Sequence, residues 1–147
     1  MLLDYRVSKK LDGATFTLCG NPEYISPEQI WATGQSFAVD WWCLGVTLYE
    51  MLMGHTPWVG PEGAVEEVEV FKRISEHSVN VLAFDDSVSI EPGLKDLIKQ
   101  LLHPNPDRRL GENKKIGEIR KHPFFAGTEW EKMVSILHTG VLMCHLK

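Results

Sequence analysis

Apolar residues occupy nearly every position of the stretch 38–53, which is long enough for a helix of about four turns. A helix that is apolar all round is buried on most of its faces. Asp40 near its start can accept backbone N–H bonds, and Gly54 ends it because glycine readily takes the left-handed conformation of a helix C-terminus. The sequence therefore predicts a buried central helix over 38–53.

Acidic and apolar residues alternate through 64–76 in the pattern of an amphipathic helix. One face carries apolar side chains and the other carries glutamates that face water. We expect the apolar stripe to consist of Val65, Val68 and Ile74, helped by Phe71, and the solvated face to contain Glu66, Glu67 and Glu69.

A third helix is predicted over 92–102, where leucine and isoleucine recur at helical spacing. Pro92 suits its first turn, and the prolines that follow residue 102 end it. A short helix is expected over 114–121, loops over 1–35 and 79–90, and no convincing pair of strands anywhere. The pattern predicts a mostly α single domain that begins with a long loop.

The composition excludes several classes of function. The 147 residues are 44% hydrophobic, enough for one core, and the net charge of -5 argues against a nucleic-acid binder. The 3 cysteines are widely spaced and favour a reducing compartment, and the 6 histidines show no metal-ligand spacing. No segment has the length of a membrane span. We expect a cytoplasmic or nuclear protein.

Four sequence motifs indicate a known protein family. They are Asp4-Tyr5-Arg6, the stretch Thr15-Phe16-Thr17-Leu18-Cys19-Gly20-Asn21-Pro22-Glu23-Tyr24-Ile25-Ser26-Pro27-Glu28, the run Asp-Trp-Trp-Cys-Leu-Gly from Asp40, and Arg109-Leu110-Gly111. In this order and spacing they resemble the AGC family of Ser/Thr protein kinases, and most of all its cAMP- and cGMP-dependent branch.

The resemblance covers residues 1–131 and leaves 132–147 as a non-matching tail. It implies the C-terminal, substrate-binding lobe of the protein-kinase fold, with an activation segment at 4–28, the central helix at 38–53 and a helical remainder at 64–125. The family's Gly-rich loop, ATP-anchoring Lys and His-Arg-Asp catalytic loop have no counterpart in the chain. We therefore expect the N-terminal lobe to be absent.

The resemblance also implies a metal role and a switch. Asp4 stands where the family's catalytic Asp binds the Mg²⁺ that bridges the ATP phosphates, a suitable task for a hard oxygen ligand. Arg6 replaces the family's Gly, which departs from the usual loop. Thr17 aligns with the activation phosphosite, whose phosphate would pair with basic groups such as Lys9.

The substrate-contacting residues follow from the same resemblance. Leu18, Pro22 and Ile25 match the apolar pocket for the substrate residue after the phosphoacceptor. Glu23 and Glu50 match the acidic positions that hold arginines upstream of it, because carboxylates can bind guanidinium groups in bidentate fashion. Asn21 stands where the family has Thr, a second departure.

Two further positions are structural. Glu28 and Arg109 match a buried ion pair that anchors the substrate loop, and losing one partner of such a pair costs roughly 3–5 kcal/mol. Asp40 matches the residue at the start of the central helix that accepts backbone N–H groups from the catalytic loop. A plain helix cap is the simpler interpretation of the same carboxylate.

The expected function is part of a Ser/Thr kinase that transfers the γ-phosphoryl group of ATP, with Mg²⁺, to basic protein or peptide substrates. A regulatory subunit or domain is an expected partner. Two alternatives stay open. One is a catalytically inactive, pseudokinase-like binding module, motivated by Arg6, Asn21 and the missing lobe. The other is a truncated, non-functional fragment whose apolar surface would be exposed.

Overall fold

The computed structural model describes residues 20–78, 80, 82–112 and 116–135, and this part of the chain is helical with no β-strand element. The mostly α fold class is therefore confirmed. The elements in chain order are η1 (Pro22–Tyr24), α1 (Pro27–Ile30), α2 (Ala38–Met53), α3 (Glu67–Ser75), α4 (Pro92–Leu101), η3 (Pro106–Arg108), α5 (Ile116–Arg120) and η5 (Pro123–Phe125). Asp4, Arg6, Lys9, Thr17 and Leu18 lie outside the described residues.

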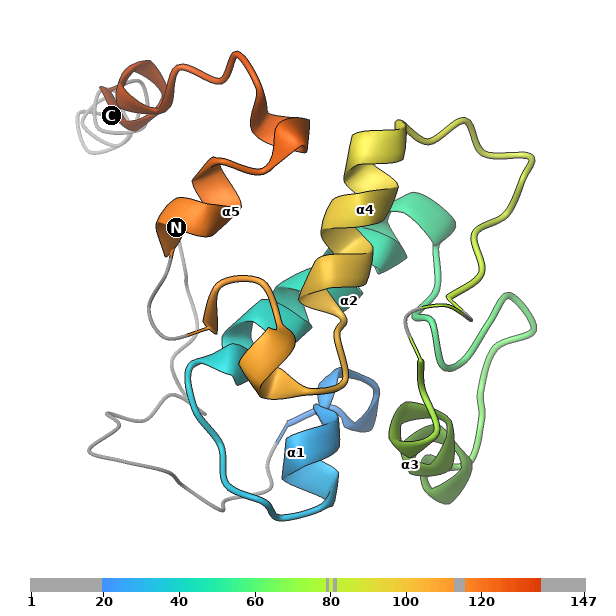
Figure 1. Cartoon of the computed structure of the whole chain (residues 1–147). Helices are drawn as coiled ribbons and strands as arrows, with labels where there is room; N and C mark the ends of the chain where they lie inside the picture. Colours follow the sequence, from blue (N-terminus) through green and yellow to red (C-terminus); the bar gives the residue numbers. More distant parts are fainter. Residues whose placement is uncertain (1–19, 79, 81, 113–115, 136–147) are drawn as a thin grey trace, which may run out of the picture.

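The central helix has the predicted bounds, and Figure 1 shows α2 running through the middle of the molecule behind α4. Gly54 ends it with φ of 77°, and its N–H donates to the Glu50 carbonyl at 2.8 Å. The start of α2 differs from the prediction that Asp40 accepts its first backbone N–H groups. Ser36 Oγ, not Asp40, accepts a helix-start backbone N–H, that of Ala38 at 3.1 Å. No backbone N–H of the described residues donates to the Asp40 carboxylate, so the helix-cap interpretation of Asp40 is wrong.

The main core forms around Trp42 of α2, whose side chain is fully buried. Its ring stacks on that of Trp58 with centroids 5.4 Å apart and planes within 2° of parallel. The other buried members come from α2, α3, α4 and the connecting segments: Val46, Tyr49, Val70, Ile74, Leu82, Ile98 and Leu102. One tryptophan pair therefore organises the packing of three helices.

The register of α3 corrects the prediction for 64–76. The helix begins at Glu67, and its buried residues are Val70 and Ile74, which are four apart on one face. Val68 lies about 200° around the helix from Val70 and is 80% exposed. Val65 still packs on the core, but from the segment before the helix. Placing Val68 on the core face was wrong because Val70 and Ile74 define the buried face and Val68 points away from it.

Smaller deviations concern the first segment and α5. The stretch predicted as irregular contains η1 and the single-turn α1, in which Ser26 N donates to Gln29 Oε1 at 3.0 Å. The short helix expected over 114–121 is α5, Ile116–Arg120. Another helical segment begins at Trp130, beside Phe125, with ring centroids 5.0 Å apart.

Close packing of α2 on α4 depends on Gly45. A Cβ at this position would lie 2.9 Å from Leu102 Cγ and Cδ2 and 3.0 Å from Leu101 Cβ. These distances are shorter than ordinary van der Waals contact, and both leucines are fully buried. A side chain at residue 45 would thus push the two helices apart.

Gly45→Ala is expected to lower the free energy of unfolding by about 1–3 kcal/mol, because overpacking outweighs the gain of up to about 1 kcal/mol in helix propensity. Urea unfolding measures the difference. Gly117→Ala in α5 is the matched control, since a Cβ there meets nothing within 4 Å. Equal effects of the two substitutions would contradict the packing argument.

The same core holds a buried titratable group, His77. Its ring lies edge-on to Trp42 and Trp58, with centroids 6.0 Å and 5.0 Å away, and Nε2 is 3.1 Å from the Leu102 carbonyl oxygen. Burial lowers the pKa of His77 below its usual 6.5, and the Leu102 carbonyl opposes this only in part. The folded state therefore favours the neutral imidazole.

Stability is expected to fall as the pH drops below about 6.5, because the unfolded chain takes up a proton that folded His77 resists. Above that value both states hold the neutral ring, and the full stability is present. Urea unfolding at about pH 7.5 and about pH 5.5 measures the slope. His77→Gln should flatten the slope, whereas the control His55→Gln should keep it. An unchanged slope in His77→Gln would contradict this account.

Candidate functional site

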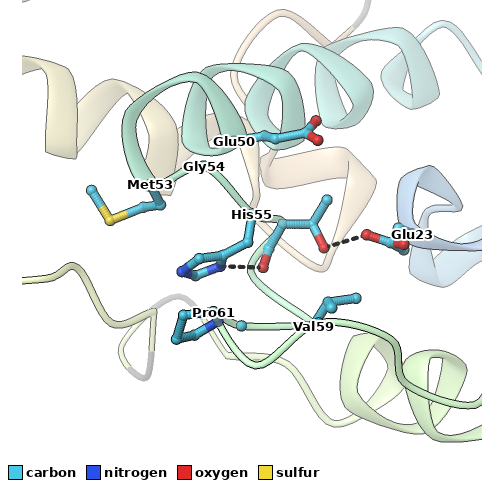
Figure 2. A pocket seen from close by; sticks show the side chains of 10 residues that line it. Glu23, Glu50, Met53, Gly54, His55, Val59 and Pro61 are labelled. Atoms are coloured by element: carbon cyan, nitrogen blue, oxygen red, sulfur yellow. Dashed lines mark hydrogen bonds between the residues drawn. The ribbon is translucent and has the colours of Figure 1, made fainter.

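Glu23 and Glu50 line one open pocket of about 450 Å³. Glu23 comes from η1 and Glu50 from the last turn of α2, and the turn after α2 forms the floor between them. Figure 2 shows the two glutamates at one end of the pocket, with Met53 and Pro61 at the other. The fold thus gathers the two predicted arginine-binding carboxylates at a single site.

The Glu50 carboxylate is held by a neutral hydroxyl. Tyr24 donates its O–H to Glu50 Oε2. Burial, and next the hydrogen bond and charge of Glu50, raise the pKa of Tyr24 to about 12. The phenol therefore stays protonated at neutral pH, and it orients the carboxylate without cancelling its charge.

Glu23 is held at two points. Thr56 Oγ1 donates to Glu23 Oε2 at 2.7 Å, a bond drawn in Figure 2, and Trp58 Nε1 donates to the Glu23 carbonyl at 2.8 Å. Thr56 is only 2% exposed. Sequence reasoning missed Tyr24, Thr56 and Trp58 as site residues. Only Tyr24 carried a signal, since it follows Glu23 directly in the motif.

The opposite end of the pocket is less polar. Met53 and Pro61 line it together with His55, whereas Val59 lies nearer to Glu23 in Figure 2. The His55 ring is fixed by a hydrogen bond between Nδ1 and the Thr56 carbonyl, 3.0 Å apart, as Figure 2 shows. A ligand in this pocket would therefore meet negative charge at one end and apolar surface at the other.

A second hollow, of about 310 Å³, contains Ile25, Asp40, Cys43 and Asn21. Ile25 is buried, and Asn21 Oδ1 accepts the Glu23 N–H at 3.2 Å. Burial raises the pKa of Asp40, and burial followed by the Asp40 charge raises the pKa of Cys43 to about 11. The Cys43 thiol is thus neutral and a poor nucleophile at neutral pH. Pro22, predicted to share an apolar pocket with Ile25, does not line this hollow.

The ion pair expected between Glu28 and Arg109 is present. Arg109 Nη1 and Nη2 donate to Glu28 Oε1 and Oε2 at 2.6 and 2.8 Å, and both side chains are buried. Arg109 also donates to the backbone carbonyls of Ala38, His103 and Pro104. All five of its N–H groups therefore have acceptors.

The described residues contain no group of three or more His, Cys, Asp or Glu side chains placed to hold a metal ion. The predicted Mg²⁺ ligand, Asp4, lies outside this part of the chain. None of the helices in residues 20–78, 80, 82–112 and 116–135 is long and apolar enough to cross a membrane.

Comparison with known proteins identifies the family. The protein kinase domain model matches residues 1–125 of the chain. The chain belongs to the protein kinase domain family. Within this kinase domain, the described helices correspond to the C-terminal lobe, as the resemblance implied.

The relatives are AGC-type Ser/Thr kinases. The cAMP-dependent protein kinase catalytic subunit PRKX of Mus musculus is 39% identical over 90% of this chain and 35% of its own length. The Serine/threonine-protein kinase YPK1 of Saccharomyces cerevisiae is 41% identical over 88% of this chain and 18% of its own. The cAMP-dependent protein kinase catalytic subunit 3 of Drosophila melanogaster is 38% identical over 91% and 22%. The chain thus spans about a third of these relatives or less.

Arg109→Lys is expected to lower the free energy of unfolding of this kinase lobe by about 1–3 kcal/mol, because an ammonium group keeps the charge opposite Glu28 but cannot reach all the acceptors of the planar guanidinium. Thermal or urea unfolding measures the loss. Arg108→Lys is the matched control, since Arg108 is the exposed neighbour and should change stability by less than about 0.5 kcal/mol. A small effect of Arg109→Lys would contradict the importance of the five hydrogen bonds that the Arg109 guanidinium donates.

Proposed function

We propose that this chain is the substrate-binding lobe of a cyclic-nucleotide-dependent-type Ser/Thr kinase and binds arginine-rich protein segments. The observation that carries the proposal is the convergence of Glu23 and Glu50 on one open pocket. Within the described part of the chain, neither carboxylate forms an ion pair with Lys or Arg. The pocket therefore keeps its negative charge available for a basic ligand.

Arginine fits this pocket better than lysine does. A guanidinium presents five donors in a planar fork, so it can reach two carboxylates on separate elements at once. An ammonium is a compact and strongly hydrated charge with weaker directional preference. Carboxylates held by Tyr24 and Thr56 offer fixed acceptors, which favour the ligand with fixed donors.

The complete kinase would transfer the ATP γ-phosphoryl group to Ser or Thr of such segments. In this proposal Asp4 binds Mg²⁺, Thr17 is the activation phosphosite, and Leu18 and Ile25 contact the residue after the phosphoacceptor. Asp40, which no described backbone N–H satisfies, would accept N–H groups of a catalytic loop. A regulatory subunit or domain would compete for the same acidic surface, and a cytoplasmic or nuclear location suits these partners.

A second candidate function is a binding module without catalysis. Arg6 in the metal loop and Asn21 in place of the family's Thr favour it, and Asn21 is engaged in holding the Glu23 N–H. A phosphotransfer assay on the protein isolated from its native source separates the two functions. Peptide binding without phosphate transfer would support the binding module.

Glu23→Gln and Glu50→Gln are each expected to weaken binding of an arginine-rich peptide about tenfold, because each change removes one charged acceptor. Fluorescence anisotropy with the 147-residue chain and a labelled peptide measures the affinity. Added salt should weaken wild-type binding, since the pocket is open to solvent.

Glu76→Gln is the matched control, because Glu76 is exposed at the end of α3 and lies outside the pocket. It should leave the affinity unchanged. The proposal fails if wild type does not bind the peptide, or if all three glutamine variants bind it equally well.

A further inference from the structure

The side chain that fixes the acidic end of the pocket comes from a buried residue in the turn after α2. Thr56 donates its Oγ1–H to Glu23 Oε2 at 2.7 Å. Thr56 lines the pocket but is only 2% exposed, so its side chain offers a ligand little surface of its own. The Thr56 hydroxyl thus donates to the Glu23 carboxylate rather than to solvent.

The rest of the turn holds Thr56 in place. The Thr56 carbonyl accepts hydrogen bonds from His55 Nδ1 and from the backbone N–H groups of Val59 and Gly60. The Trp58 indole holds the Glu23 main chain at the same time. Both ends of Glu23 are therefore fixed by one short segment, which leaves its carboxylate little freedom to rotate.

The arrangement leaves a defined pair of acceptors. Thr56 occupies Oε2 of Glu23, and Tyr24 occupies Oε2 of Glu50. No described residue donates to Oε1 of either glutamate. These two oxygens come from two elements and remain open to a ligand, and a guanidinium presents its donors in a planar fork whereas an ammonium is a compact point charge.

We propose that Thr56 is a positioning residue that sets the pocket's preference for arginine over lysine, an inference that rests on the proposed peptide-binding function. The hydroxyl holds the Glu23 carboxylate in the orientation that a guanidinium needs. Less side-chain entropy is therefore lost when the ligand binds. Loss of the Thr56 hydroxyl leaves the negative charge of Glu23 in the pocket, but the carboxylate is then free to rotate. Arginine binding should then suffer more than lysine binding.

The test uses two peptides that differ only in arginine or lysine at every basic position, with affinities measured by anisotropy on the 147-residue chain. Thr56→Val removes the hydroxyl and keeps the side-chain shape. It should weaken arginine-peptide binding about fivefold and lower the arginine-to-lysine affinity ratio by a similar factor. Thr56→Ser should keep both values near those of wild type.

Thr56→Ala compared with Thr56→Ser gives a second pair that differs only in the hydroxyl, which covers the case in which Thr56→Val does not fold. The inference is overturned if neither hydroxyl-free variant lowers the affinity ratio. It is also overturned if both peptides weaken equally, since a merely structural Thr56 would act that way.

The proposed function fails separately. The proposed function is contradicted if wild type binds neither peptide, or if Glu23→Gln and Glu50→Gln do not change the affinity. The positioning role of Thr56 is then contradicted as well. If the two glutamates matter and Thr56 does not, the proposed function survives and only the positioning role is lost.

Discussion

The fold of this lobe depends on one buried guanidinium. Arg109 follows η3 and donates to the Glu28 carboxylate of α1, to the Ala38 carbonyl at the start of α2, and to the carbonyls of His103 and Pro104 after α4. Three helices thus meet at one side chain. Since burying an ion pair costs desolvation that its attraction must offset, the loss on removing either partner exceeds what the intact pair contributes to net stability.

That arrangement reaches the candidate site through a continuous set of contacts. The Arg109 guanidinium lies over the Trp42 ring at 5.0 Å, Trp42 stacks on Trp58, and Trp58 Nε1 holds the Glu23 carbonyl. Arg73 of α3 donates to the Trp58 carbonyl at 2.8 Å. Each step is a ring contact or a hydrogen bond from a side chain to a side chain or a backbone carbonyl, so the geometry of the pocket depends on the same core that Arg109 assembles.

The sequence predicted those parts of the molecule whose causes are local or carried by a motif. The bounds of α2 follow from a long apolar run that ends in glycine, and the Glu28–Arg109 pair follows from the family resemblance. The register of α3 was not predicted, because nothing in 64–76 marks the first helical turn and the alternation of Val and Glu fits two faces. Ser36 as the helix-start acceptor was also missed, since Asp40 was the more conspicuous carboxylate.

The pocket illustrates a further limit of sequence reasoning. Glu23 and Glu50 stand out in a motif, but Thr56 and Trp58, which hold Glu23, reach it only through the turn after α2, whose path depends on tertiary packing.

Three glutamates show how the partner decides the role of a side chain. Glu28 is buried against the Arg109 guanidinium, which balances its charge inside the protein, so the role of Glu28 is structural. Glu23 and Glu50 are half-buried and receive hydrogen bonds only from neutral groups of the described chain. A neutral donor fixes the direction of a carboxylate and leaves its charge to act outward. A surface that must recognise a basic ligand needs both properties, and hydroxyl donors provide them where an arginine of the protein itself would not.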